Sequence, residues 1–457
     1  MTTAAAIAAW LPRARWYAAK DGAAARVSIH DAARIPGTTV ALALVDVAAD
    51  GVDTRYAVPM DGDADAALSP EFAGWVVQAV LDGTVTAADH GLFRGHPVAA
   101  PVHEASAVRA TTTVAPLGGD ASNTSLLVTS GRRQFAVKLL RRCRAGIQPE
   151  VEVGEFLSRD GGWTGTPRLH GWLDYAPTSG EPIAIATVHA FALGCTSAWD
   201  HLGSLMTAGG LAGSRREAII GVAVVLGRLT AEMHRVLASR ADLPAFAPVM
   251  PTAADMQGEA GRMADHASVV FGRAAARLDT LPTDIATSVR AVLSKRDEIV
   301  TSLRGIGAIH AAAAMIRVHG DYHLGQVLIR EPGPEALVID FEGEPSRPLA
   351  ERRRKTSVFK DVAGMCRSFD YALRHAARTG AAPYQPADLR LLEATFLDAY
   401  RAVARGHAWW PDDERTADAL LAVYTLDKAV YELAYELANR PEWVEVPLAA
   451  LVSRQAT

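Results

Sequence analysis

The feature that most constrains this chain is a pair of short β-rich runs, each ending in a loop that carries an aspartate. Asp321 follows the first run, residues 315–318, and Asp340 lies in the second, residues 336–341. A single aspartate after a strand usually caps a turn. Phosphoryl transfer, however, needs two such groups: one carboxylate to accept the proton of the acceptor hydroxyl, and one to hold Mg²⁺ against nucleotide phosphates. The pair therefore predicts Asp321 as the base and Asp340 as a metal ligand.

The residues around Asp321 strengthen this interpretation. His319, Asp321 and Gln326 match the spacing His-x-Asp-x-x-x-x-Asn of kinase catalytic loops, with glutamine in place of asparagine. Glutamine keeps the carbonyl oxygen that a metal ion needs, so Gln326 is a second candidate metal ligand. For His323 we expect a hydrogen bond that braces the loop, because no further metal-ligating residue lies at a suitable spacing.

A lysine upstream supplies a candidate phosphate contact. Lys138 ends a predicted strand, Phe-Ala-Val-Lys, that is similar to the Val-Ala-Ile-Lys segment of kinases. In that segment the ammonium contacts nucleotide phosphates and pairs with a helix carboxylate. The following helix offers Glu150, Glu152 and Glu155, of which Glu152 lies in the middle of the segment.

A small, polar loop lies between the first two strands before Lys138. Residues 117–125 include Ser122, Asn123 and Thr124 and are small enough for backbone N–H groups to approach phosphate oxygens. The loop follows neither of the familiar glycine-rich nucleotide patterns, and a plain hairpin loop explains it equally well by itself. Its position before Lys138 favours a nucleotide loop.

Composition excludes several other classes of protein. The 457 residues are 49% hydrophobic and 21% charged, which is ordinary globular usage. With 46 Lys and Arg against 51 Asp and Glu, the net charge is −5, so we expect no nucleic-acid partner. The longest apolar run, residues 218–227, is too short to span a bilayer. Three isolated cysteines and the absence of a secretion signal predict a cytoplasmic protein.

The periodicity of the chain predicts an α+β organisation. A hairpin over residues 39–58 and a helix from Ser69 to Gly83 precede a connection, with a boundary near Pro101. An antiparallel meander is expected over residues 106–140, with strands at residues 111–115, 125–129 and 134–140. Beyond residue 200 the pattern is mostly helical, with long helices predicted over residues 215–239, 288–303, 389–404 and 416–437.

Several motifs together resemble the aminoglycoside phosphotransferase-like kinases, and more closely the actinobacterial maltokinases. The similarity covers nearly the whole chain in one consistent order. It rests on residues 10–16, 122–125, 319–326, 339–345, 348–353, 361–364, 367–369 and 427–432, with Arg440, Pro441 and Trp443 beyond them.

This resemblance implies a bilobal, protein-kinase-like α+β fold. Residues 1–100 would form an N-terminal cap domain, residues 101–195 a β-rich nucleotide-binding lobe, and residues 196–457 a mostly helical C-terminal lobe. The implied reaction is ATP- and Mg²⁺-dependent phosphorylation of the anomeric hydroxyl of maltose. Maltokinases commonly work beside trehalose synthase in glycogen synthesis, so that partner is implied as well.

The same resemblance implies particular residue roles. Asp321 would be the catalytic base, Gln326 and Asp340 the magnesium ligands, and Lys138 with Glu152 the phosphate-positioning pair. Asp361 would brace the catalytic loop. The acceptor sugar would bind near Asp321 on side chains of the last helices, with Lys428, Tyr431, Glu432 and Trp443 as candidates.

Two alternatives remain open on the sequence. The acceptor could be glucosamine, another monosaccharide or an aminoglycoside, with a carboxylate such as Glu432 pairing the ammonium. The chain could also be a pseudokinase that serves as an interaction module, because a fold does not fix an activity. The joint presence of Lys138, Asp321, Gln326 and Asp340 argues against the second alternative.

Overall fold

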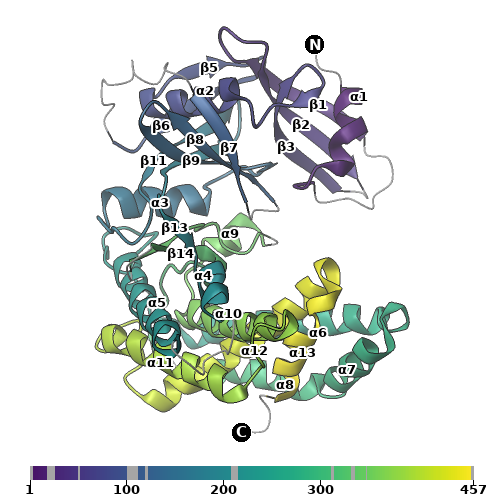
Figure 1. Ribbon diagram of the computed structural model, residues 1–457, viewed down its shortest axis with the longest axis vertical. Helices are drawn as coiled ribbons and strands as arrows, with labels where there is room; N and C mark the ends of the chain where they lie inside the picture. Colours follow the sequence, from purple (N-terminus) through teal and green to yellow (C-terminus); the bar gives the residue numbers. More distant parts are fainter. Residues whose placement is uncertain are drawn as a thin grey trace. The chain divides into compact units, whose positions relative to one another are not determined.

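The computed structural model divides into two compact units whose sequences interleave. The first contains residues 1–193 and 340–353, and the second contains residues 194–339 and 354–457. The structure describes residues 4–17, 26–49, 52–99, 112–118, 122–206, 215–309, 313–330, 335–345 and 347–453. Figure 1 shows residues 1–193 of the first unit in purple to blue with two sheets and its helix α9 in green, and the second unit as a mainly helical body.

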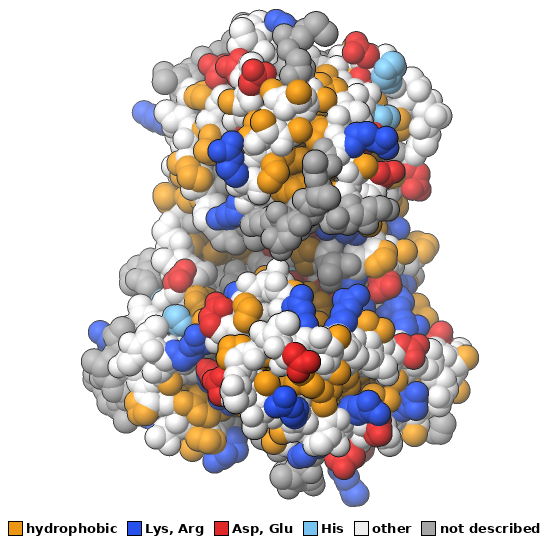
Figure 2. Space-filling model, turned by 90° about the vertical axis from the view of Figure 1, so that its right-hand side faces the viewer, with side chains coloured by type: hydrophobic (Ala, Val, Ile, Leu, Met, Phe, Trp, Pro, Cys, Tyr) orange, Lys and Arg blue, Asp and Glu red, His pale blue; other side chains and the backbone are white. Residues whose placement is uncertain are grey.

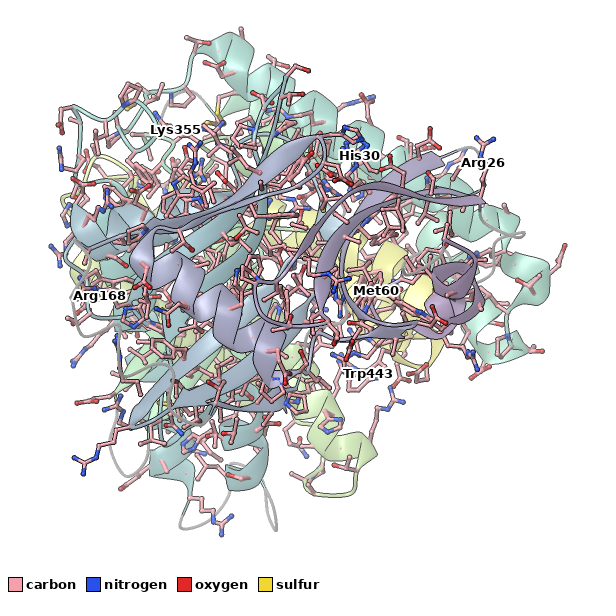
Figure 3. The ribbon with its side chains drawn as sticks, turned by 90° about the horizontal axis from the view of Figure 1, so that it is seen from above. Arg26, His30, Met60, Arg168, Lys355 and Trp443 are labelled. Carbon is pink, nitrogen blue, oxygen red and sulfur yellow. The ribbon has the colours of Figure 1, made fainter. Side chains whose placement is uncertain are left out.

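The first sheet of the first unit has five strands in the order β1-β2-β3-β10, with β4 paired to β3. Its strands are β1 (Arg26–Arg34), β2 (Ala41–Ala49), β3 (Val52–Asp61), β4 (Ala64–Asp65) and β10 (Arg142–Cys143). Helix α1 (Ala4–Trp10) and a 3₁₀ turn (Leu11–Arg13) precede it. Figure 3 looks onto this sheet, where Arg26 and His30 mark β1 and Met60 marks β3.

The predicted hairpin and the predicted first helix are both confirmed. Strands β2 and β3 pair antiparallel, although the turn at residues 50–51 lies outside the described residues. Helix α2 (Pro70–Asp82) begins where the Ser69 hydroxyl accepts a hydrogen bond from Phe72 N at 3.1 Å. It ends at Gly83, whose φ of 66° places it in the left-handed region.

The second sheet has seven strands in the order β5-β6-β11-β12-β9-β8-β7. These are β5 (Val85–Ala87), β6 (Gly91–Pro97), β7 (Thr112–Leu117), β8 (Thr124–Ser130), β9 (Arg133–Leu139), β11 (Leu169–Pro177) and β12 (Ile183–Ala190), and α3 (Pro149–Arg159) lies between β10 and β11. The predicted meander is confirmed as β7-β8-β9. The expected boundary at Pro101 lies outside the described residues, and the bounds of the three expected domains remain a prediction.

Alternating residues of β2 join the two sheets into one packed body. Leu42 and Leu44 belong to the core that α2 shares with the seven-stranded sheet, whereas Val45 and Val47 pack with α1 on the opposite face. This alternation follows from the two-residue period of a strand, and it buries β2 on both faces.

A buried carboxylate fastens β1 to the second sheet. Asp31 is 2% exposed and accepts hydrogen bonds from Tyr175 Oη at 2.7 Å, Asp89 N at 2.9 Å and His90 N at 3.1 Å. An ionised group at this depth is tolerated only because donors surround it.

The second unit combines a small sheet with helices. The sheet has the order β13-β14-β15 and contains β13 (Cys195–Ser197), β14 (Val327–Arg330) and β15 (Ala336–Val338). The helices are α4 (Ala198–Leu205), α5 (Arg216–Leu237), α6 (Ala253–Ala276), α7 (Thr283–Leu293), α8 (Arg296–Arg304), α10 (Phe359–Arg378), α11 (Pro386–Ala404), α12 (Glu414–Asn439) and α13 (Glu445–Ser453). Short 3₁₀ turns lie at residues 278–280, 305–308, 324–326 and 441–443, and α9 (Leu349–Arg352) belongs to the first unit.

Three of the four predicted long helices are confirmed as α5, α11 and α12. The prediction of one helix over residues 288–303 is wrong, because α7 ends at Leu293 and α8 begins at Arg296. Residues 315–318 are also not a strand: Met315 and Ile316 form only isolated bridges, to Val249 and Thr356. Helices α5 and α11 lie side by side in Figure 1.

The surface carries charged side chains of both signs. On the face drawn in Figure 2, basic and acidic side chains are interspersed on each unit. Among the helices that the structure describes, none combines the length and the apolarity needed to cross a bilayer.

The Asp31 contacts generate a stability prediction. Replacing Asp31 with alanine removes the acceptor of four hydrogen bonds, three of them from the second sheet and its loop and one from Ala32 N, and each orphaned buried donor is costly, so we expect a loss of roughly 2–4 kcal/mol in the free energy of unfolding. Chemical unfolding followed by fluorescence measures it. Asp53→Ala, at an exposed position on β3, is the control and should change little. Equal unfolding curves for the two variants would contradict the assigned role of Asp31.

Candidate active site

The first unit gathers carboxylates around Lys138. This lysine lies on β9, where the strand register places it opposite Ser125 and Thr187. Its Nζ contacts Asp340 Oδ1, lies 3.0 Å from Glu342 Oε1, and lies 3.9 Å from Glu150 Oε2. The ammonium and the surrounding carboxylates are mostly buried, which strengthens their attraction relative to the same pairs in water.

Asp340 has an unusual backbone conformation. Its φ of 69° is the only positive φ of a non-glycine residue in the part of the chain that the structure describes. Aspartate tolerates this left-handed region better than most residues do, but the conformation still costs free energy. Such strain is found at sites where the surrounding contacts fix a functional side chain, and here the Lys138 ammonium supplies that contact.

Glu342 is a functional candidate that the sequence reasoning missed. Its Oε1 accepts hydrogen bonds from Lys138 Nζ and from Asn123 Nδ2, each at 3.0 Å. It thereby links the predicted phosphate contact to the predicted nucleotide loop. The two-residue spacing of Asp340 and Glu342 was the available signal, since both side chains meet the same lysine.

The predicted pairing of Lys138 with Glu152 is wrong in this structure. Glu150 is the helix carboxylate near Lys138, whereas both Glu152 oxygens bond Arg353, at 2.6 and 3.0 Å. The reason is helical geometry: residues two apart point about 200° away from each other around the axis. Glu150 faces inward and is 4% exposed, so Glu152 faces outward.

Ser122 and Thr124 lie at the same loop as Asn123, at the start of β8. Residues 119–121 of the loop lie outside the described residues. Whether these segments bind nucleotide stays a prediction.

In the second unit, Asp321 is held by a lysine. Lys428 on α12 places its Nζ 3.0 Å from Asp321 Oδ1 and 4.7 Å from the centroid of the Tyr431 ring. The structure thus brings three of the predicted acceptor-site residues together. Both members of the ion pair keep some side-chain exposure, 14% for Lys428 and 20% for Asp321.

The backbone before Asp321 is fixed by Asp361, as predicted. The Asp361 carboxylate accepts hydrogen bonds from His319 N at 2.7 Å and Gly320 N at 2.8 Å. His234 Nε2 lies 3.0 Å from the same carboxylate, and His234 Nδ1 lies 2.8 Å from Tyr400 Oη. Although burial alone would raise it, the pKa of Asp361 is lowered by the hydrogen bond from His234 and by nearby histidines and backbone N–H groups.

Two further contacts shape this loop. His323 Nδ1 accepts a hydrogen bond from Gly325 N at 3.0 Å, which confirms the bracing role expected for His323. Gly364 on α10 lets the loop approach closely, because a Cβ there would lie 2.4 Å from the Tyr322 carbonyl oxygen. Gln326 follows in the same loop, where its backbone carbonyl accepts a hydrogen bond from Ile339 N at 2.9 Å.

Glu432 and Trp443 have protein partners of their own. Glu432 is buried and bonds Arg367, whose guanidinium lies 2.8 Å away and also bonds Asp370. Trp443 stacks on Tyr371 and His375 at centroid distances of 5.9 and 5.5 Å. Their role in binding a sugar stays a prediction, and the structure gives both a packing role within the second unit.

The residues predicted to bind magnesium have suitable chemistry. Asp340 supplies carboxylate oxygens and keeps a side-chain exposure of 24%, and Glu342 adds a second carboxylate on the same lysine. Mg²⁺ prefers such hard oxygen ligands and usually binds one or two carboxylates together with substrate phosphates. Among the described residues, no group of three or more His, Cys, Asp and Glu is arranged to hold a metal ion.

Comparison with known proteins agrees with this geometry. Residues 113–343 match the phosphotransferase enzyme family, and residues 10–89 match the maltokinase N-terminal cap domain. A glucosamine kinase of Streptacidiphilus jiangxiensis is 30% identical over 83% of this chain and 85% of its own length. A second, from Mycolicibacterium smegmatis, is 27% identical over 74% of this chain and 78% of its own length.

Solved structures give the same result for the fold. A glucosamine kinase in complex with glucosamine, ADP and inorganic phosphate has a TM-score of 0.65 and 24% identity, with 99% of each chain covered. Another crystal form of a glucosamine kinase has a TM-score of 0.67 and covers each chain fully at 23% identity.

The chain therefore belongs to the phosphotransferase enzyme family, and its fold is the predicted kinase-like α+β fold. Within that family it is a protein that carries the maltokinase type of N-terminal cap domain.

The Asp361 contacts generate a prediction with a defined pH dependence. Asp361→Asn should lower stability at neutral pH by about 3 kcal/mol, because it removes a buried charge from its partners. The folded-state pKa lies below the ordinary value of 3.8, so this stabilisation is present above that pH and is lost as the pH falls through the folded-state pKa. Unfolding measured from pH 7 to pH 3 should show the gap between wild type and variant closing in acid. A gap that stays constant would contradict the assignment.

Proposed function

We propose that this protein is an ATP-dependent sugar kinase that phosphorylates the anomeric hydroxyl of maltose. Membership of the phosphotransferase family and the glucosamine kinases among its relatives support a sugar kinase. The maltokinase-type cap domain supports maltose. The set of Lys138, Asp321, Gln326 and Asp340 supports an enzyme over a pseudokinase.

The observation that carries the choice of a neutral sugar is the Lys428 ammonium, 3.0 Å from the Asp321 carboxylate. A hydroxyl that approaches Asp321 also approaches this positive charge. A neutral sugar can accept a hydrogen bond from Lys428, whereas the ammonium group of an amino sugar near the same point would be repelled. The buried carboxylate that was the candidate partner for such an ammonium, Glu432, is already bonded to Arg367.

Glucosamine is the second candidate acceptor. It is favoured by the two relatives that are glucosamine kinases, which match most of this chain at 30% and 27% identity. Glucosamine differs from maltose in both charge and length, so a direct comparison of the two acceptors decides between them.

The proposed chemistry uses Asp321 as general base. Its carboxylate accepts the proton of the acceptor hydroxyl while the hydroxyl oxygen bonds to the γ-phosphorus and the bond to the leaving ADP breaks. Asp361 fixes the backbone at residues 319–320, so the orientation of Asp321 is set before substrate binds.

On the nucleotide side, Lys138 would contact the phosphates, with the backbone of Ser122, Asn123 and Thr124 near them. Asp340 and Gln326 would hold Mg²⁺, which neutralises charge on the β- and γ-phosphate oxygens when it is bound. Glu342 would keep Lys138 in place, because its carboxylate bonds both Lys138 and Asn123. The partnership with trehalose synthase stays a prediction.

The experiment that tests the function measures ATP turnover with maltose, glucose, glucosamine and kanamycin side by side, and locates the phosphorylated carbon by NMR. We expect maltose to give the highest kcat/KM, with the phosphate on its anomeric carbon. A higher kcat/KM for glucosamine would refute maltose but keep the sugar kinase. Absence of turnover with every acceptor, despite ATP binding, would favour the pseudokinase.

A substitution at Lys428 tests the charge argument. Lys428→Met removes the positive charge near Asp321, so the ratio of kcat/KM for glucosamine to that for maltose should rise by about tenfold, as expected from one partly screened charge. Lys295→Met, on the surface of the same unit, is the matched control and should leave the ratio unchanged. An unchanged ratio in Lys428→Met would refute this role.

Substitutions at the two aspartates separate binding from chemistry. Asp321→Asn should lose at least about 100-fold in kcat, because it removes the base, and should retain ATP affinity. Asp340→Ala should lose the Mg²⁺-dependent part of ATP binding. Calorimetric titration with ATP, with and without MgCl₂, measures the ATP affinity of both variants, and the ATP turnover assay measures kcat. Each variant is the control for the other. Identical binding curves for the two variants would contradict the division of roles.

A further inference from the structure

A buried arginine connects the cap sheet to the predicted nucleotide loop. Arg141 is 2% exposed, and its guanidinium donates three hydrogen bonds. Nη2 bonds Asp65 Oδ2 at 2.7 Å and Nη1 bonds the Ala57 carbonyl oxygen at 3.3 Å, both in the five-stranded sheet. Nε bonds Thr124 Oγ1 at 2.8 Å, at the first residue of β8 in the seven-stranded sheet.

The main chain of the same residue also joins the two sheets. Arg141 lies between β9 and β10, where the chain leaves one sheet and enters the other. The preceding residue, Leu140, donates its N–H to Ile185 O on β12 at 2.8 Å, whereas the carbonyl oxygen of Arg141 accepts from Ala57 N on β3 at 2.9 Å. The backbone that carries the guanidinium is therefore fixed on both sides.

A tryptophan of the N-terminal segment covers the guanidinium. The centre of the Arg141 guanidinium lies 4.4 Å from the centroid of the Trp16 ring, which is the geometry of a cation–π contact. Burial lowers the pKa of Arg141, and Asp65 opposes that effect. A buried charge is tolerated when its donors are satisfied, and here the partners come from three different segments.

We infer that Arg141 is a positioning residue through which the cap sheet fixes the nucleotide loop for ATP binding. The hydrogen bond to Thr124 is what makes the link specific. Thr124 directly follows Asn123, whose side chain bonds Glu342, so this end of the loop is held by Arg141 at one residue and by Glu342 at the next. The inference rests on the proposed function, because it requires that this loop binds nucleotide.

Positioning of this kind has a defined energetic signature. A loop held in its binding conformation loses less conformational entropy when the phosphates arrive, so loosening it weakens ATP binding. The acceptor sugar does not contact this loop in the proposed reaction, and its KM should not respond. A purely structural arginine behaves differently, because its loss lowers the fraction of folded enzyme and leaves the affinity of each folded molecule unchanged.

The test measures the dissociation constant of ATP by calorimetry, without acceptor, and then KM for ATP and for acceptor. For Arg141→Lys we expect a Kd for ATP about tenfold higher, as for loss of one charge-assisted hydrogen bond, with KM for acceptor unchanged. Thr124→Val should give a similar rise in the Kd for ATP. Thr124→Ser, which keeps the hydroxyl, should bind ATP as tightly as the wild type. The double variant Arg141→Lys, Thr124→Val should bind no more weakly than Arg141→Lys does.

The controls make the outcome decisive. Arg55→Lys alters another ion-paired arginine of the cap sheet, bonded to Asp46, and should leave the Kd for ATP unchanged. If Arg141→Lys does not fold, Asp65→Asn weakens the same anchor and should raise the Kd for ATP in the same way. Wild-type ATP binding together with unchanged affinity in the variants would overturn the inference alone. Absence of ATP binding by the wild-type protein would overturn the proposed function with it.

Discussion

The first unit depends on one ammonium group that three carboxylates share. Lys138 is fixed on β9 by the strand register, and it draws Asp340, Glu342 and Glu150 to a single point. The electrostatic attraction is strong because the group is mostly buried, and it holds Asp340 in a left-handed backbone conformation that is otherwise unfavourable. In the proposed function, nucleotide phosphates would pair with Lys138 here, and Mg²⁺ would bind the Asp340 carboxylate.

The second unit holds the proposed base on a loop that has little secondary structure of its own. Residues 319–323 make no strand, and the backbone N–H groups of residues 319–321 are bonded by side chains instead. Asp361 provides two acceptors for this purpose, and His234 and Tyr400 extend the network into the helices α5 and α11. The pair of Asp321 and Lys428 lies on this support, which ties the orientation of the proposed base to the helical core.

The sequence predicted the elements whose signals are local. Ser69 and Gly83 bound a helix because capping depends on neighbouring residues, and the β7-β8-β9 meander follows from the alternation of apolar and polar residues.

Contacts between distant segments were harder to predict from the sequence. The outward face of Glu152 and its partner Arg353 depend on how α3 packs, which periodicity alone did not settle. Glu342 was missed because its importance comes from Lys138 and Asn123, both about 200 residues earlier. The residues between α7 and α8, Ser294 and Lys295, are neither glycine nor proline, so no local signal predicted the break.

The interleaving of the two units has a consequence for dissecting the protein. Residues 340–353 are covalently inserted between parts of the second unit but belong to the first. A fragment that stops at Leu193 would keep Lys138 and lose Asp340 and Glu342, leaving a buried ammonium without two of its counter-ions. No single cut of the gene separates this protein into two self-sufficient halves, and a split version would need the 340–353 segment supplied in trans or fused after residue 193.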